Sequence, residues 1–231
     1  EGAFAQSPSI RWMTLAAVEP PTIESGVWDA SLRIYVPQNS LNVYKSAWAQ
    51  FAGGINSINR IFGEYSIVPA SGGAEIFQYL GSAGDVEIPQ TINDLTVVSL
   101  GSYAFGAETL SVTIPDTVTT LKAAAFSNCG IETITLGANI TSIAENAFYG
   151  CTSLAEIIVE GGNQSFVTID NALYNTSRTR LIAYPAGNPQ ISFDIPQGVV
   201  EIGAGAFSGA TELITINIPN SVTAVESRAF D

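Results

Sequence analysis

The sequence contains no histidine among its 231 residues. This absence excludes catalytic triads with a histidine base and every metal site with an imidazole ligand. Neither a G-x-S-x-G elbow nor a Walker-type phosphate loop is present. The common sequence signatures of hydrolytic and nucleotide chemistry are therefore missing, and we expect the protein not to be an enzyme.

Basic residues are scarce: eight Lys and Arg stand against 21 Asp and Glu, which gives a net charge of −13. Binding to nucleic acid needs clustered Lys and Arg, so we expect no nucleic-acid partner. The charge is also unevenly placed. Residues 1–63 hold four acids and four bases, and residues 64–231 carry the whole −13. This asymmetry predicts a domain boundary near residue 63.

Long apolar runs are absent as well. No stretch approaches the roughly 18 apolar residues of a membrane span, so we expect no membrane insertion in this segment. The first residues lack the pattern of a signal peptide, and for an exported protein we expect that peptide to be cleaved or to precede residue 1.

The acids are dispersed without a D-x-D-x-D-G run, which predicts no calcium site. The glycines of 203–209 are spaced G-x-G-x-x-x-G, one residue too long for a dinucleotide loop, so no cofactor is expected.

Two short marks recur along the chain. One is an apolar residue followed by proline, and the other is the dipeptide Ala-Phe. Ala3-Phe4 is an early instance. From residue 104 onward the phenylalanines of this second mark are Phe105, Phe126, Phe148, Phe207 and Phe230, with neighbouring members 21, 22 and 23 residues apart outside one long interval. We expect Leu173 to fill the same slot within that interval. A period in the low twenties predicts a repeat solenoid in which stacked units share one core.

The residues from Leu213 to Phe230 illustrate one unit. Leu213, Ile216 and Ile218 fit an extended L-x-x-I-x-I segment, and the following proline ends the strand because it cannot donate to a ladder. The sequence therefore predicts a β-rich leucine-rich repeat with short parallel strands and few helices.

The run I-P-x-x-V-x-x-I-x-x-x-A-F-x-x-C resembles the BspA-like (treponemal-type) leucine-rich repeats of bacterial cell-surface proteins. The resemblance covers residues 77–231 in about six repeats, with a hairpin insertion at 171–187. Residues 1–63 resemble the closing repeat of such an array, with a capping helix at about 40–52, and 64–76 would form a joint. Because an array ending at Asp231 has no visible cap, either the chain is a fragment or its end packs on another molecule, end to end.

Cys129 and Cys151 occupy the same slot of adjacent repeats. Stacking would bring their backbones roughly 5 Å apart, which permits a disulfide. Free cysteine also behaves as a small core residue, and we favour two reduced, buried thiols.

Outward-facing strand positions are the candidate binding site. If the strands stack in register, these positions form one broad ladder, consisting of Thr133, Thr135, Glu156, Ile158, Ser192, Asp194, Thr215 and Asn217. A merely solvated sheet face is an equally good interpretation. Tyr174 and Tyr184, on the inserted hairpin, are a second candidate patch, or they cover the core.

The resemblance implies an extracellular, surface-displayed adhesion module that recognises a host or microbial surface protein, or a glycan. A structural spacer that displays other domains is the alternative. A polysaccharide-acting enzyme with Glu156 and Asp194 as paired carboxylates is a remote one.

Overall fold

The computed structural model describes residues 12–14, 20, 33–36, 41–47, 55–57, 60–82 and 84–231. The chain divides into two compact units, residues 1–68 and 69–231, and the division falls within strand β5 (Tyr65–Ala70). The predicted joint over 64–76 thus contains β5 and the beginning of β6 (Gly73–Tyr79).

The described part of the first unit contains three parallel strands, in the order β1 (Trp12–Thr14), β2 (Arg33–Val36) and β3 (Ile55–Ser57). Helix α1 (Leu41–Ala47) lies within the predicted capping helix, and the rest of that predicted range, 40 and 48–52, is outside the described residues. β4 (Arg60–Phe62) pairs with β5 in the antiparallel direction. Within the described residues, no helix is long and apolar enough to cross a membrane.

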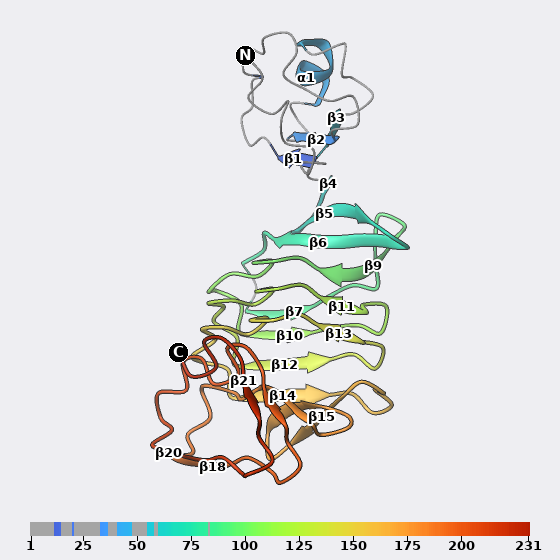
Figure 1. The fold of residues 1–231 in the computed structure, drawn as a ribbon. Coiled ribbons are helices and arrows are strands. Elements are labelled where there is room, and N and C mark those ends of the chain that lie inside the picture. Colours follow the sequence, from blue (N-terminus) through green and yellow to red (C-terminus); the bar gives the residue numbers. More distant parts are fainter. Residues whose placement is uncertain are drawn as a thin grey trace, which may run out of the picture. The chain divides into compact units, whose positions relative to one another are not determined.

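The second unit is a solenoid whose short strands stack as parallel rungs (Figure 1). One column consists of β7 (Asp85–Glu87), β10 (Ser111–Thr113), β12 (Thr133–Leu136) and β14 (Glu156–Val159). The other contains β6, β9 (Leu95–Leu100), β11 (Thr120–Leu121) and β13 (Ser142–Ile143). β8 (Thr91–Ile92) pairs with β9 in the antiparallel direction. The predicted leucine-rich-repeat solenoid is confirmed.

Both columns are interrupted after β13 and β14. Residues 166–183 form an antiparallel meander of β15 (Phe166–Ile169), β16 (Ala172–Asn175) and β17 (Arg180–Ala183). Parallel stacking then resumes, with β19 (Glu201–Ile202) and β21 (Ala224–Val225) beside β17, and with β18 (Ser192–Asp194) beside β20 (Thr215–Asn217). Across residues 84–231, no ladder joins β14 to β18 or β13 to the meander.

Aromatic rings stack along the core and report the same interruption. One series runs from Tyr79 through Phe105 and Phe126 to Phe148, with ring centroids 5.8, 5.0 and 5.9 Å apart. A second series runs from Tyr184 through Phe207 to Phe230, at 5.4 and 5.2 Å. Tyr184, and not Leu173, therefore fills the aromatic slot of the long interval. Leu173 was the wrong prediction, because its strand β16 belongs to the inserted meander, where it is buried against other residues.

Both cysteines are free and buried. The Cys129 thiol donates to the carbonyl of Gly106 at 3.0 Å, and the Cys151 thiol donates to that of Phe126 at 2.8 Å. Each thiol thus binds the preceding coil. Burial raises the pKa of Cys129, and it raises the pKa of Cys151 to about 12, so neither is a reactive thiolate at neutral pH.

Candidate binding face

Four of the predicted face residues lie together on the β7–β10–β12–β14 sheet. Thr133 pairs with Glu156 in register, and Thr135 pairs with Ile158. The strands alternate, so Ile134 between the threonines is fully buried, whereas the side chain of Ile158 is 39% exposed. The structure thereby places these four side chains on one outward face.

This face extends over two strands that the prediction omitted. Asp85 and Ser111 continue the row of Thr133, and Glu87 and Thr113 continue that of Thr135. The Ser111 hydroxyl donates to the Asp85 carboxylate at 2.6 Å. The same alternation before Ile88-Pro89 and Ile114-Pro115 was the sequence signal that could have found them.

The other four predicted residues lie on a separate sheet. Ser192 pairs with Thr215 and Asp194 pairs with Asn217, and all four are exposed. The Asn217 side-chain amide donates to the Asp194 carboxylate. The single continuous ladder expected from the sequence is wrong, because the inserted meander separates β14 from β18.

An open groove of about 590 Å³ lies beside the β18 edge of the second sheet. One wall is the two-residue turn Asp170–Asn171, whose positive φ angles of 48° and 67° suit a tight hairpin between β15 and β16. The Asn171 side-chain amide donates to the Ala155 carbonyl at 2.6 Å and so ties this turn to the residue preceding β14. The polar side chains of the groove are Asp170, Asn171, Gln190, Ser192 and Asp194.

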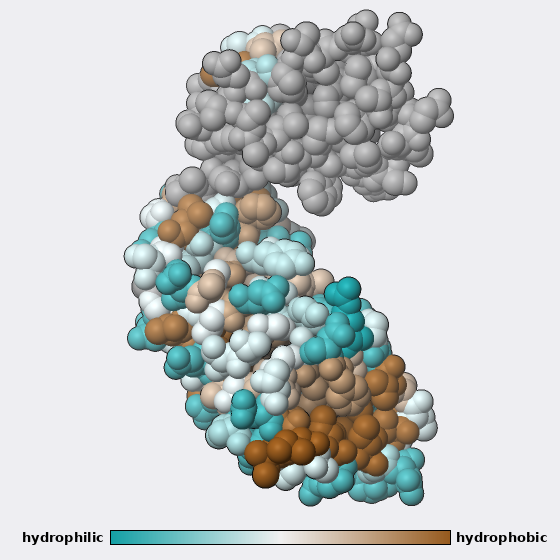
Figure 2. All heavy atoms as spheres, turned by 90° about the vertical axis from the view of Figure 1, so that its left-hand side faces the viewer, coloured by the Kyte–Doolittle hydropathy of each residue, from teal (hydrophilic) through white to brown (hydrophobic). Residues whose placement is uncertain are grey.

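One exposed isoleucine lines this groove, and a second lies in the adjacent coil. Ile191 lines it and is 61% exposed. Ile214 is 81% exposed, and its N–H donates to the Ile191 carbonyl at 2.8 Å, so the two residues occupy the same position in adjacent coils. Figure 2 shows hydrophobic side chains gathered over this end of the second unit, beside hydrophilic ones. The apolar pair and the polar groove together are called the C-terminal binding face below.

The second candidate patch, formed by the two tyrosines of the inserted hairpin, is not on the surface. Tyr174 is fully buried and Tyr184 is 3% exposed, and both belong to the core around Phe193 and Phe207. The enzyme hypothesis required Glu156 and Asp194 to form a carboxylate pair on one face. The structure does not support that pair, because the two residues belong to different sheets. Within the described residues, no group of three or more His, Cys, Asp or Glu side chains could hold a metal ion.

The family of this chain is identified from its repeat unit. The sequence profile of the BspA-type leucine-rich repeat region matches residues 72–192 and 186–231, with six copies. The chain belongs to this family. The resemblance of the I-P and A-F marks is thereby confirmed. The six copies cover the same unit of the structure that stacks its strands as rungs.

Solved structures of bacterial leucine-rich repeat proteins are similar to this chain. A protein from Eubacterium ventriosum is 19% identical with a TM-score of 0.47, and the match covers 74% of this chain and 62% of that one. The leucine-rich repeat protein of T. pallidum is 23% identical with a TM-score of 0.47, over 72% and 79% of the two chains. A leucine-rich cell surface protein from Faecalibacterium prausnitzii is 20% identical with a TM-score of 0.37, over 74% and 73%. The chain thus spans less than two thirds of the Eubacterium protein, and a comparison with curated proteins finds no match.

Proposed function

We propose that this solenoid is a protein-binding module and that its partner docks on the C-terminal binding face. The observation that carries the proposal is the exposed Ile191–Ile214 pair beside a groove of carboxylate, amide and hydroxyl side chains. Protein interfaces have this composition, with an apolar centre that loses water and a polar rim that fixes orientation. A merely solvated sheet face would not need two isoleucines at 61% and 81% exposure.

The biological setting follows from the family and stays a proposal. We infer a surface-displayed, extracellular adhesion module that meets a host or microbial surface protein. The second unit carries an excess of acids, which favours a partner with a basic or neutral contact surface. A glycan is the alternative ligand, because Asp170, Gln190 and Asp194 offer several hydrogen-bonding groups to sugar hydroxyls. A spacer that only displays other domains is the further alternative.

A binding screen against extracellular-matrix proteins and glycans tests the proposal. With any partner that the screen yields, Ile191→Lys should weaken binding by about tenfold or more, because a charge replaces a desolvated anchor. Val200→Lys is the matched control: Val200 is 42% exposed and outside the groove, and this change should leave affinity intact.

The other sheet needs its own variant. Thr135→Lys places the same charge on the β12 strand, in the sheet that lacks the isoleucine pair. Loss of binding in Thr135→Lys with full binding in Ile191→Lys would move the site to that sheet and overturn the proposal. A screen without any ligand would support the spacer.

A further inference from the structure

The interruption of the solenoid leaves β13 as the edge of its sheet. The Ser142 N–H donates to the Thr119 carbonyl at 3.2 Å, and the Ala144 N–H donates to the Leu121 carbonyl at 3.0 Å, both in the preceding coil. Strand geometry therefore turns the N–H and C=O of Ile143 to the opposite side. Across residues 84–231, the ladder contains no strand on that side of β13.

Later coils show what the edge lacks. The Leu181 carbonyl of β17 accepts from the Gly203 N–H at 2.9 Å, and the Ile202 carbonyl of β19 accepts from the Glu226 N–H at 2.9 Å. In each case the next coil supplies the donor. The insertion removes that coil from β13, so its backbone keeps an unused pairing direction.

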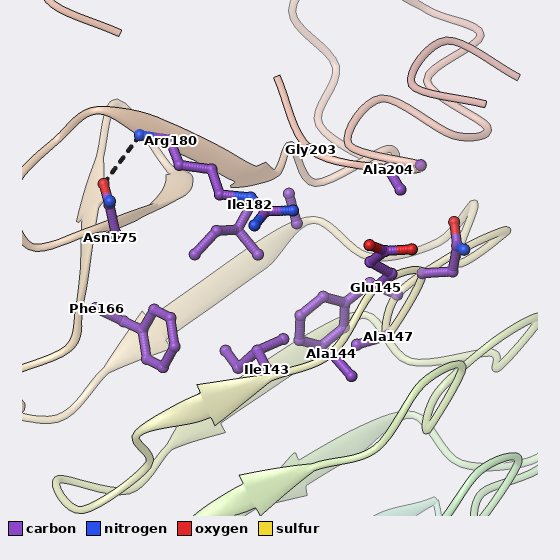
Figure 3. Close-up of a pocket in the computed structure, with 14 residues that line it drawn as sticks. Ile143, Ala144, Glu145, Ala147, Phe166, Asn175, Arg180, Ile182, Gly203 and Ala204 are labelled. Atoms are coloured by element: carbon purple, nitrogen blue, oxygen red, sulfur yellow. Dashed lines mark hydrogen bonds between the residues drawn. The ribbon is translucent and has the colours of Figure 1, made fainter. Parts of the chain in front are cut away.

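A cavity of about 270 Å³ lies at this edge (Figure 3). Apolar side chains from β13, the following turn and the meander line it, among them Ile143, Phe148, Phe166 and Ile182. Figure 3 shows Arg180, from β17, and Glu145, which follows β13, beside the apolar side chains of Ile143, Phe166 and Ile182. The combination of an open strand edge and apolar lining is the geometry by which proteins add an extended peptide to a sheet.

The charges at the cavity indicate which kind of peptide would fit it. Arg180 is the cation, and its guanidinium contacts the carboxylates of Glu201 at 3.1 Å and Glu226 at 2.7 Å. Glu145 also lines the cavity and forms no ion pair with the described residues. The cavity and its rim thus hold three carboxylates and one guanidinium, for a formal charge of −2. The side-chain oxygen of Asn146, another lining residue, is buried and accepts no hydrogen bond from the described part of the chain. The cavity therefore has an excess of negative charge and of hydrogen-bond acceptors. A ligand with a cationic donor would complement both.

We propose that the β13 edge and its cavity bind an extended peptide segment that carries a Lys or Arg side chain. The peptide backbone pairs with Ile143, and the basic side chain lies over the apolar lining with its charged end toward Glu145 and Asn146. This site is separate from the C-terminal binding face, and it does not depend on the function proposed for that face.

A random heptapeptide library displayed on phage and selected on the full chain is the first probe. Basic residues flanked by β-branched ones should be enriched in the selected sequences. An enriched peptide is then synthesised with a fluorophore, and its affinity is measured by anisotropy. Glu145→Lys should weaken binding by about tenfold or more, whereas Glu212→Lys, the same charge change at an exposed residue outside the cavity, should leave it within about twofold.

Backbone pairing needs a separate readout. Methylation of alternate peptide nitrogens removes the donors that a ladder requires and should abolish binding. Selected sequences without basic residues, equal affinities for the two lysine variants, or full binding of the methylated peptide would each overturn the proposal.

Discussion

Residues in the left-handed conformation recur at one position of the coil, directly before the alanine of the Ala-Phe turn. Tyr103, Ala124, Asn146, Gly205 and Arg228 hold this position, with φ between 56° and 65°. The chain must turn sharply here so that the alanine and the ring both enter the core. Only Gly205 adopts the conformation without steric cost, and the other coils accept strain at this turn.

Ala124 offers a direct measurement of that strain. Its φ is 58°, where a Cβ costs roughly 1–2 kcal/mol, while glycine costs about 0.4–1 kcal/mol through the entropy of the unfolded chain. Ala124→Gly should therefore raise the free energy of unfolding by about 0.5–1 kcal/mol. The control is the next residue: Ala125 is fully buried, and Ala125→Gly should be destabilising. Urea unfolding of wild type and the two variants measures these free energies. A lower free energy of unfolding for Ala124→Gly than for wild type would refute the argument.

The buried tyrosine hydroxyls test a second residue-scale point. The Tyr174 hydroxyl is buried and has no hydrogen-bond partner among the residues that the structure describes, and burial raises the pKa of Tyr174. Removing an unsatisfied hydroxyl costs nothing, so Tyr174→Phe should leave stability unchanged or raise it by about 1 kcal/mol. Tyr149→Phe is the contrast, because the Tyr149 hydroxyl donates to Asp231 at 3.2 Å and its loss should be slightly destabilising. Thermal melts compare the two, and a Tyr174→Phe variant that melts well below wild type would contradict the expectation.

At the scale of elements, Arg180 of β17 ties together two later coils. It pairs with Glu201 of β19 and with Glu226, the residue after β21. A hydrogen bond with Glu226, and then burial, raise the pKa of Glu201. At Glu226 burial acts upward, but hydrogen bonds from Glu201, the Ala204 amide and Arg180 outweigh it and lower the pKa.

Opposite shifts predict opposite pH dependences. Glu201 keeps its proton to higher pH in the folded state, so its stabilisation is present at low pH and is lost as the pH rises through the raised pKa. Glu201→Gln lacks this loss, so its melting temperature should rise relative to that of wild type as the pH is raised above about 4.5, the ordinary pKa. The lowered pKa of Glu226 gives stability that is present above its ordinary pKa of 4.5 and is lost as the pH falls below that value. Glu226→Gln lacks this gain, so its melting temperature should fall relative to that of wild type as the pH is raised from strongly acidic values to about 4.5. A change in the same direction for both variants would exclude the hydrogen bond between the two carboxyl groups as the cause of the opposite shifts.

The sequence predicted the elements that follow the repeat and missed those that the insertion rearranges. Ile134 and Phe126 could be assigned to the core because alternation and the 21-residue period fix which side chains point inward. The period alone could not locate the interruption, which the family resemblance placed as a hairpin at 171–187, because β15 to β17 form pairs within a local meander that no repeat slot describes. Tyr184 replaced Leu173 in the aromatic stack for the same reason, and the face residues were divided between two sheets.

At the scale of the whole second unit, the two aromatic series and the separate ladders define two blocks. One runs from β6 to β14 and the other from β15 to β21. The bonds between them are mostly single contacts from turns and side chains, such as Gly187 N–H to the Leu154 carbonyl at 2.7 Å and Gly150 N–H to the Ser208 hydroxyl at 3.2 Å. A solenoid is stabilised by contacts between neighbouring coils. The boundary between the two blocks, which few backbone hydrogen bonds cross, is therefore expected to be the least stable part of the array.

Native-state hydrogen exchange measures whether the blocks open separately. Val112 and Val199 are both fully buried, one in each block. Truncation of either to alanine should remove about 1–3 kcal/mol of local stability. Val112→Ala should lower the protection of amides in 85–159 more than in 192–231, and Val199→Ala should do the reverse, because stability in a stacked array is lost chiefly within the block that holds the change. A uniform loss of protection across 85–231 in both variants would mean that the insertion transmits stability as well as an uninterrupted coil would, and the two-block description would then be wrong.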